Sequence, residues 1–204
     1  MAGCKVIGIL GGVGSGKTIV TDYLKNKYKA YVIRADEIAH RLYKKGQPGY
    51  QAIIRICGKS VLDENRQIDR RKLGNIIYNN PEKPGEVNSA IHPMVYRKTA
   101  ELIREYDRIH HHRLVVYEAA LIPYSCPDIA DEFWYIYTPA DIRTQRLHND
   151  RGYDFERISD IIGIQPSDEE YREFCDRIII NDGTFEKLEE QIDEIIKYSK
   201  RKQR

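Results

Sequence analysis

Residues 11–18 read Gly-Gly-Val-Gly-Ser-Gly-Lys-Thr, and this stretch decides the fold. It follows the apolar run Val6–Leu10, which has a strand pattern, and it precedes Ile19–Leu24, which begins an amphipathic helix. The spacing G-x-x-x-x-G-K-[ST] between a strand and a helix is typical of a loop that holds phosphate groups. Glycines let successive backbone N–H groups turn inward onto an anion, and the helix adds its positive end. We therefore predict that the chain binds a nucleoside triphosphate.

The polar residues of this loop have predicted roles in phosphate chemistry. Lys17 is placed to reach the β- and γ-phosphates, and the Thr18 hydroxyl is placed to hold Mg²⁺. A glycine-rich turn that binds nothing is the alternative, and the strand–loop–helix context argues against it. The predicted ATP-binding residues of the loop are Gly12, Val13, Gly14, Ser15, Gly16, Lys17 and Thr18.

Composition narrows the class of protein. A chain of 204 residues fits one domain with a sizeable core. Its formal net charge of +2 indicates no strongly charged polymer as a partner, so we expect neither a nucleic acid nor a membrane. The four cysteines are isolated in the sequence, which fits a reducing cytoplasm, and no apolar run approaches membrane-spanning length. We expect a monomer or a small homo-oligomer.

Apolar runs and helical spacing predict the fold class. Four short apolar runs after the first one predict further strands, at Ala30–Ile33, Leu114–Tyr117, Glu132–Tyr137 and Arg177–Ile180. Helical segments separate them, so we predict a three-layer α/β/α P-loop fold with a five-stranded parallel sheet. We expect a single domain, 1–204, in which residues 1–40, 114–141 and 175–204 form the nucleotide-binding core, 41–113 a helical insertion for the second substrate, and 142–174 a helical lid.

Two carboxylates follow predicted strands, where ligands bind in open α/β sheets. Asp36 follows the second strand and could face an acceptor hydroxyl group. Its alternative role is the N-cap of the helix that Glu37 opens, and position alone does not choose between the two. Glu118 follows the third strand, and we predict that it helps to hold Mg²⁺. The alternative for Glu118 is an acid that neighbouring loop N–H groups satisfy.

Arginines follow the fourth predicted strand. Arg143 and Arg146 are spaced to share one face of a helix, and Arg151 follows beside Gly152. Arginine suits phosphate recognition because its guanidinium stays charged and donates two hydrogen bonds at once. One interpretation of these arginines is therefore a mobile lid that closes over the triphosphate, and the other is a charged outer face of the helix. Asn181 follows the fifth strand near the expected adenine edge, where it either binds the base or forms a plain turn.

In this order, the segments resemble the dephospho-coenzyme A kinase family over nearly the whole chain. The loop at 11–18 is similar to the family's Gly-Gly-Ile-Gly-Ser-Gly-Lys-Ser, and Ile33–His40 is similar to its Ile-Asp-Ala-Asp-x-Ile-Ala-His. Ile68–Leu73 is similar to the family's Ile-Asp-Arg-x-x-Leu. Further positions of this chain that match the family are Ile91-His92-Pro93, Arg146-Leu147, Arg151, Gln165, Asp176 and Asn181.

The resemblance implies an activity and roles for residues. The family transfers the γ-phosphoryl group of ATP to the ribose 3′-hydroxyl of dephospho-coenzyme A, which implies ATP and Mg²⁺ as cofactors and dephospho-coenzyme A as substrate. Asp36 matches the proposed base for the acceptor hydroxyl. Lys17 and Arg146 match groups that stabilise the transferring phosphoryl. Arg70 and His92 lie in the family's coenzyme A-binding region.

Two departures from the family pattern leave alternatives open. Arg34 stands where the family has the first aspartate of Asp-Ala-Asp, and residues 118–124 read Glu-Ala-Ala-Leu-Ile-Pro-Tyr. One alternative is therefore a kinase for another small hydroxyl acceptor, such as a nucleoside or a metabolite. The other is a non-catalytic nucleotide-binding regulatory module. The intact phosphate-binding residues and Asp36 argue against that second alternative.

Overall fold

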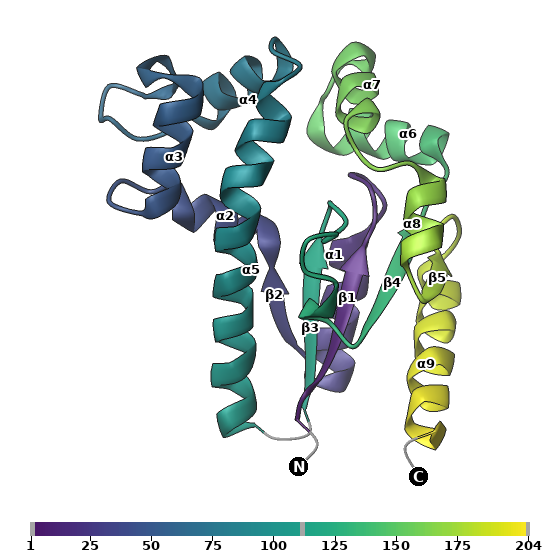
Figure 1. The fold of residues 1–204 in the computed structure, drawn as a ribbon. Helices are drawn as coiled ribbons and strands as arrows, with labels where there is room; N and C mark the ends of the chain where they lie inside the picture. Colours follow the sequence, from purple (N-terminus) through teal and green to yellow (C-terminus); the bar gives the residue numbers. More distant parts are fainter. Residues whose placement is uncertain (1–2, 111–112, 203–204) are drawn as a thin grey trace. The chain divides into compact units, whose positions relative to one another are not determined.

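The structure is a computed structural model that describes residues 3–110 and 113–202. It contains a five-stranded sheet with the order β2-β3-β1-β4-β5, and all five strands are parallel (Figure 1). The strands are β1 Lys5–Leu10, β2 Tyr31–Arg34, β3 Leu114–Ala119, β4 Glu132–Tyr137 and β5 Arg177–Ile180. The predicted fold class, an α/β fold with a five-stranded parallel sheet, is confirmed.

Helices make up most of the remaining chain. They are α1 Lys17–Tyr28, α2 Ala35–Leu42, α3 Pro48–Cys57, α4 Arg70–Tyr78, α5 Lys83–Ile109, α6 Ala140–Arg151, α7 Phe155–Gly163, α8 Asp168–Phe174 and α9 Phe185–Lys202, with 3₁₀ turns η1 Lys59–Val61 and η2 Pro127–Ile129. The chain divides into two compact units, residues 1–33 with 107–204, and residues 34–106.

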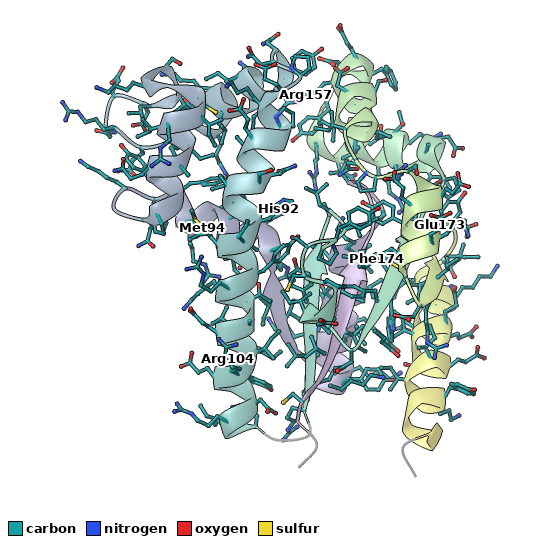
Figure 2. All side chains as sticks on the ribbon, viewed as in Figure 1. His92, Met94, Arg104, Arg157, Glu173 and Phe174 are labelled. Atoms are coloured by element: carbon teal, nitrogen blue, oxygen red, sulfur yellow. The ribbon has the colours of Figure 1, made fainter. Side chains whose placement is uncertain are left out.

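In the first unit, alternation along the strands sends side chains to two faces of the sheet. Trp134 and Ile136 of β4 face one side, in a core with apolar residues of α1 and α9. Tyr135 faces the other side, where its ring stacks on Tyr171 of α8 at 4.7 Å. Figure 2 shows Phe174 of α8 turned toward the sheet, and its ring lies 4.9 Å from that of Phe133. Helices therefore cover both faces of the sheet, which gives three layers.

Parallel pairing places the ends of the strands at one edge. The register of β1 with β3 pairs Ile9 with Glu118 and Leu10 with Ala119. β3 therefore extends beyond the predicted end at Tyr117, because backbone pairing continues past the apolar run. Glu118 is thus part of β3, beside the end of β1 from which the phosphate loop departs.

The second unit is helical: after Arg34, the last residue of β2, its described residues contain only the isolated bridge between Leu62 and Ile68 as β-structure. α3 contacts α2 and η1, and α4 contacts η1. The longest helix of the structure, α5, has 27 residues and contains Pro93. In the part of the chain that the structure describes, no helix combines the length and the apolar character that a membrane span needs.

Candidate active site

The phosphate loop joins β1 to the first turn of α1. Gly16 is the residue before α1, with φ of 86°, and the helix begins at Lys17. Lys17 Nζ donates hydrogen bonds to the carbonyl oxygens of Gly11 and Gly12, at 2.8 and 3.0 Å. The ammonium group is thus folded back over the loop, and the free N–H groups of the first helical turn open onto the same place. This arrangement can hold an anion.

Two glycines of the loop are needed because other parts of the chain approach them closely. A Cβ atom at Gly16 would overlap the Nδ2 atom of Asn181, and the positive φ already disfavours a side chain there. A Cβ atom at Gly12 would overlap the Nη1 atom of Arg143. The loop is therefore shaped by α6 and by the residue that follows β5.

Three side chains hold the loop from outside. Asn181 is buried, and its Nδ2 donates to the carbonyl of Ser15 at 2.8 Å. The Thr138 hydroxyl lies 3.0 Å from that same carbonyl oxygen. Arg146 donates from Nη1 to the Gly14 carbonyl at 3.4 Å and from Nη2 to the Asn181 carbonyl at 3.2 Å. These contacts bring Arg146, which was predicted to stabilise the transferring phosphoryl group, and Asn181, a predicted ATP-binding residue, to the loop.

Asn181 and Thr138 add to what the sequence predicts. Asn181 was expected at the adenine edge, and its amide also supports the loop backbone. Thr138 was not among the predicted residues, although its position directly after β4, at the carboxyl edge of the sheet, is a signal that could have identified it.

A hydroxyl–carboxylate group adjoins the loop. Thr18 Oγ1 donates to Glu118 Oε1 at 3.3 Å, so the structure brings the two predicted metal ligands together. Thr21, one helical turn beyond Thr18, is fully buried, and its Oγ1 lies 3.1 Å from Glu118 Oε2. The sequence interpretation missed Thr21, although the i, i+3 spacing from Thr18 is a usable signal.

This oxygen-rich group fits Mg²⁺. Hard cations prefer hydroxyl and carboxylate oxygens, and Mg²⁺ is commonly held by one or two carboxylates together with substrate phosphates and water. No cluster of three or more His, Cys, Asp or Glu side chains suited to a metal occurs among residues 3–110 and 113–202. Thr18 and Glu118 bring a hydroxyl and a carboxylate oxygen together beside the phosphate loop, and these are donor types that Mg²⁺ accepts.

The arginines of α6 differ in burial. Arg143 is only 6% exposed, and Arg146 is partly buried against the loop, so the charged outer face is wrong for both. Arg151 is the last residue of α6 and is exposed, and Gly152 ends the helix with φ of 65°. Arg143 and Arg146 therefore belong to the phosphate loop's surroundings, whereas Arg151 lies at the turn into α7.

The segment between α7 and α8 is tied to the same loop. Gln165 Oε1 accepts a hydrogen bond from the backbone N–H of Val13 at 2.9 Å. Tyr171 donates its hydroxyl to the carbonyl of Ala120, which follows β3. Tyr135 donates its hydroxyl to Asp168 at 2.5 Å. Burial raises the pKa of both phenols, with the Asp168 bond as a further cause for Tyr135, so both groups stay protonated donors.

In the second unit, Asp36 lies in the first turn of α2. The residue before this helix is Arg34, which makes no side-chain capping bond, so the N-cap alternative for Asp36 is wrong. Arg34 pairs instead with Glu37 at 3.6 Å. The Asp36 carboxylate is exposed, and within the described chain no side chain forms a hydrogen bond or ion pair with it. It is thus available to a substrate.

Arg70 and His92 occupy separate helices of the second unit. Arg70 begins α4, which Asp69 caps by accepting bonds from the N–H groups of Arg71 and Lys72 at 2.8 and 3.2 Å. The guanidinium of Arg70 contacts the ring of His40. Burial, and next the charge of Arg70, lower the pKa of His40. The structure therefore places Arg70 and His40 together.

His92 lies on α5, where Figure 2 labels it, and its ring centroid is 5.8 Å from that of Tyr96. Burial lowers the pKa of His92, so the ring is held in its neutral form. A neutral imidazole can donate one hydrogen bond and accept another.

Comparison with known proteins agrees with these features. A family model described as dephospho-CoA kinase matches residues 5–187. The dephospho-CoA kinase of Carboxydothermus hydrogenoformans is 34% identical over 187 residues, which cover 92% of this chain and 90% of that protein. The dephospho-CoA kinase of a Staphylococcus aureus strain is 30% identical over 193 residues, which cover 95% of this chain and 92% of that protein.

Solved structures share the fold. A crystal structure from Thermus thermophilus has a TM-score of 0.76 at 24% identity, covering 96% of this chain and 98% of that one. The shikimate kinase of Acinetobacter baumannii has a TM-score of 0.54 at 15% identity, covering 96% of this chain and 94% of that one. These likenesses concern the fold alone. Because the family model and the curated relatives cover most of the chain, the chain belongs to the dephospho-CoA kinase family.

Proposed function

We propose that the chain phosphorylates the ribose 3′-hydroxyl of dephospho-coenzyme A with ATP, giving coenzyme A and ADP. The observation that carries this proposal is a complete phosphate loop, braced by Arg146 and Asn181, in a member of the dephospho-CoA kinase family. Phosphoryl transfer depends mainly on positioning and on stabilising charge, which are the tasks that such a loop performs.

The nucleotide binds through the loop and through cations around it. N–H groups of the loop and of the first turn of α1 donate hydrogen bonds to the phosphate oxygens. When the nucleotide binds, Lys17 exchanges its hydrogen bonds to the Gly11 and Gly12 carbonyl oxygens for bonds to the β- and γ-phosphates. Its ammonium group already lies over the loop. Arg146 stabilises the transferring group from α6, and Arg151 contacts ATP when the lid, residues 142–174, closes. Asn181 lies at the edge of the site that receives the adenine base, and its side-chain amide supports the loop by donating to the Ser15 carbonyl.

Thr18 and Glu118 hold Mg²⁺ that arrives with the nucleotide. Their oxygens, 3.3 Å apart, are of the type that this cation prefers. When bound, Mg²⁺ neutralises charge on the β- and γ-phosphate oxygens. Glu118 keeps its second oxygen close to the Thr21 hydroxyl, which limits how the carboxylate can turn.

The acceptor side belongs to residues 34–106. Asp36 orients the 3′-hydroxyl and accepts its proton as the oxygen attacks the γ-phosphate. Arg70 is suited to the anionic groups of dephospho-coenzyme A because its planar fork donates two bonds at once. His92 supplies a neutral ring for a further polar contact. We infer that residues 41–113 form the insertion that binds this substrate.

We also propose a cytoplasmic location and a monomer or small homo-oligomer. The four unbridged cysteines suit a reducing compartment.

The test of this proposal compares two neighbouring carboxylates. Asp36→Asn should lower kcat by about 10²–10⁴, the usual range for a general base, while ATP affinity stays near the wild-type value. Glu37→Gln is the matched control, because Glu37 is also exposed in the first turn of α2 and should keep kcat within about threefold. Rates come from a coupled ADP-release assay with dephospho-coenzyme A. An Asp36→Asn variant with wild-type kcat would show that another group accepts the proton.

A further inference from the structure

Arg143 is a buried cation without an anionic partner. Its side chain is 6% exposed, and its Nε atom is fully buried with no hydrogen-bond acceptor. Within residues 3–110 and 113–202, no carboxylate forms an ion pair with its guanidinium, and no oxygen accepts a hydrogen bond from it. A guanidinium stays charged at any working pH, so deprotonation cannot relieve this burial.

The guanidinium lies against the phosphate loop. A Cβ atom at Gly12 would overlap Arg143 Nη1, so the charge sits directly against this glycine. The backbone of Arg143 is also close, since its carbonyl oxygen would lie 3.1 Å from a Cβ atom at Gly14. Gln165 lies on the same side of the loop and accepts the Val13 N–H. The glycine loop and the Gln165 amide, which lie on this side of the guanidinium, carry no charge, and the carboxylate of Asp168 is hydrogen-bonded to Tyr135 and not to Arg143.

A buried charge without a counter-ion is unfavourable, and breaking a buried ion pair by removing one partner is strongly destabilising because the other charge is left uncompensated. Tyr135 and Tyr171 are near enough to feel the Arg143 charge, but both are neutral phenols. A nucleotide phosphate bound in this loop would supply the negative charge that Arg143 lacks in the free protein. We propose that Arg143 is a buried electrostatic part of the phosphate site, whose charge acts across Gly12 on the polyphosphate of the nucleotide.

This inference rests on the proposed nucleotide binding, and it predicts opposite effects on the free and the bound protein. Arg143→Met keeps an unbranched apolar stem and removes the charge. Arg143→Lys keeps the charge. Arg177→Met is the control for removal of an arginine elsewhere, because Arg177 also has a buried Nε without a hydrogen-bond acceptor but begins β5, away from the phosphate loop, where its guanidinium lies over the Tyr198 ring.

The experiment measures binding of inorganic tripolyphosphate by calorimetry and thermal unfolding of the ligand-free protein. We expect Arg143→Met to weaken tripolyphosphate binding about tenfold, a change typical of one lost charge interaction. The affinity for pyrophosphate should fall less than the affinity for tripolyphosphate, because pyrophosphate carries less charge. Arg143→Lys and Arg177→Met should stay within about threefold of wild type. The ligand-free Arg143→Met protein should unfold at the wild-type temperature or above it, because an uncompensated charge is gone.

Several outcomes overturn the inference. They are wild-type affinity in Arg143→Met, an equal loss in Arg143→Lys, no tripolyphosphate binding by the wild type, or a drop in unfolding temperature with unchanged affinity. The last of these would mark a packing role. Wild-type protein that binds tripolyphosphate but does not phosphorylate dephospho-coenzyme A would count against the proposed acceptor and not against Arg143.

Discussion

Replacing Gly16 by alanine tests how closely Asn181 approaches the phosphate loop. Gly16 has φ of 86°, a left-handed conformation in which a side chain costs about 1–2 kcal/mol. A Cβ atom would also overlap Asn181 Nδ2, and overpacking of this kind costs about 1–3 kcal/mol. We therefore expect Gly16→Ala to lower the free energy of unfolding by about 2–5 kcal/mol.

A double-mutant cycle separates the two causes. Asn181→Ala alone removes the bond from Nδ2 to the Ser15 carbonyl. Because the Thr138 hydroxyl remains near that carbonyl, the loss should be about 0.5–1.5 kcal/mol. With Asn181 truncated, the overlap disappears and Gly16→Ala should cost only the backbone strain, about 1–2 kcal/mol. The coupling energy should therefore be at least about 1 kcal/mol.

Urea unfolding followed by tryptophan fluorescence provides the measurement. The single tryptophan, Trp134, is fully buried in β4 and reports on the unit that contains the loop. Gly163→Ala is the control, because a Cβ atom there meets nothing within 4 Å at the end of α7, and stability should not fall. The reasoning is refuted if Gly16→Ala costs the same with and without the Asn181 side chain.

The remaining predictions concern the metal group and pH. Thr21→Val removes a hydroxyl that lies 3.1 Å from Glu118 Oε2, so the affinity of the ADP complex for Mg²⁺ should fall about tenfold or more. Calorimetry of ADP binding at increasing Mg²⁺ concentrations measures this affinity. An unchanged Mg²⁺ affinity contradicts the prediction. Burial lowers the folded-state pKa of His92 below the ordinary 6.5, so its contribution to stability is present above pH 6.5 and is lost as pH falls toward the folded-state pKa. His92→Gln should reduce the loss of unfolding free energy between about pH 7.5 and 5.5. An equal loss in both proteins rules out His92 as a cause.

Local patterns predicted the sheet and the phosphate loop well. The loop at 11–18 needs glycines and a following helix, and both requirements are visible within a few neighbouring residues. Apolar runs located all five strands, because buried parallel strands are apolar on both faces. Glu118 was placed after its strand because a charged residue interrupts the run, whereas pairing with Ile9 carries the strand further.

Contacts between distant parts of the chain were beyond these patterns. The i, i+3 spacing of Arg143 and Arg146 predicts that they share a helix face. It does not predict that Arg143 is the buried one and that Arg146 donates a hydrogen bond to the loop. Asn181 reaches Ser15 across most of the chain, and Gln165 reaches Val13 in the same way. Such contacts depend on tertiary packing, which a single sequence does not display.

The central claim is transfer of a phosphoryl group to one hydroxyl of one acceptor. The most direct test measures ADP and coenzyme A formed from ATP with dephospho-coenzyme A, and with its analogue that lacks the ribose 3′-hydroxyl. We expect equal amounts of ADP and coenzyme A with dephospho-coenzyme A, and no acceptor-dependent ADP with the analogue. ADP release that is as fast with the analogue, or retained ATP binding with no transfer to dephospho-coenzyme A, would contradict it.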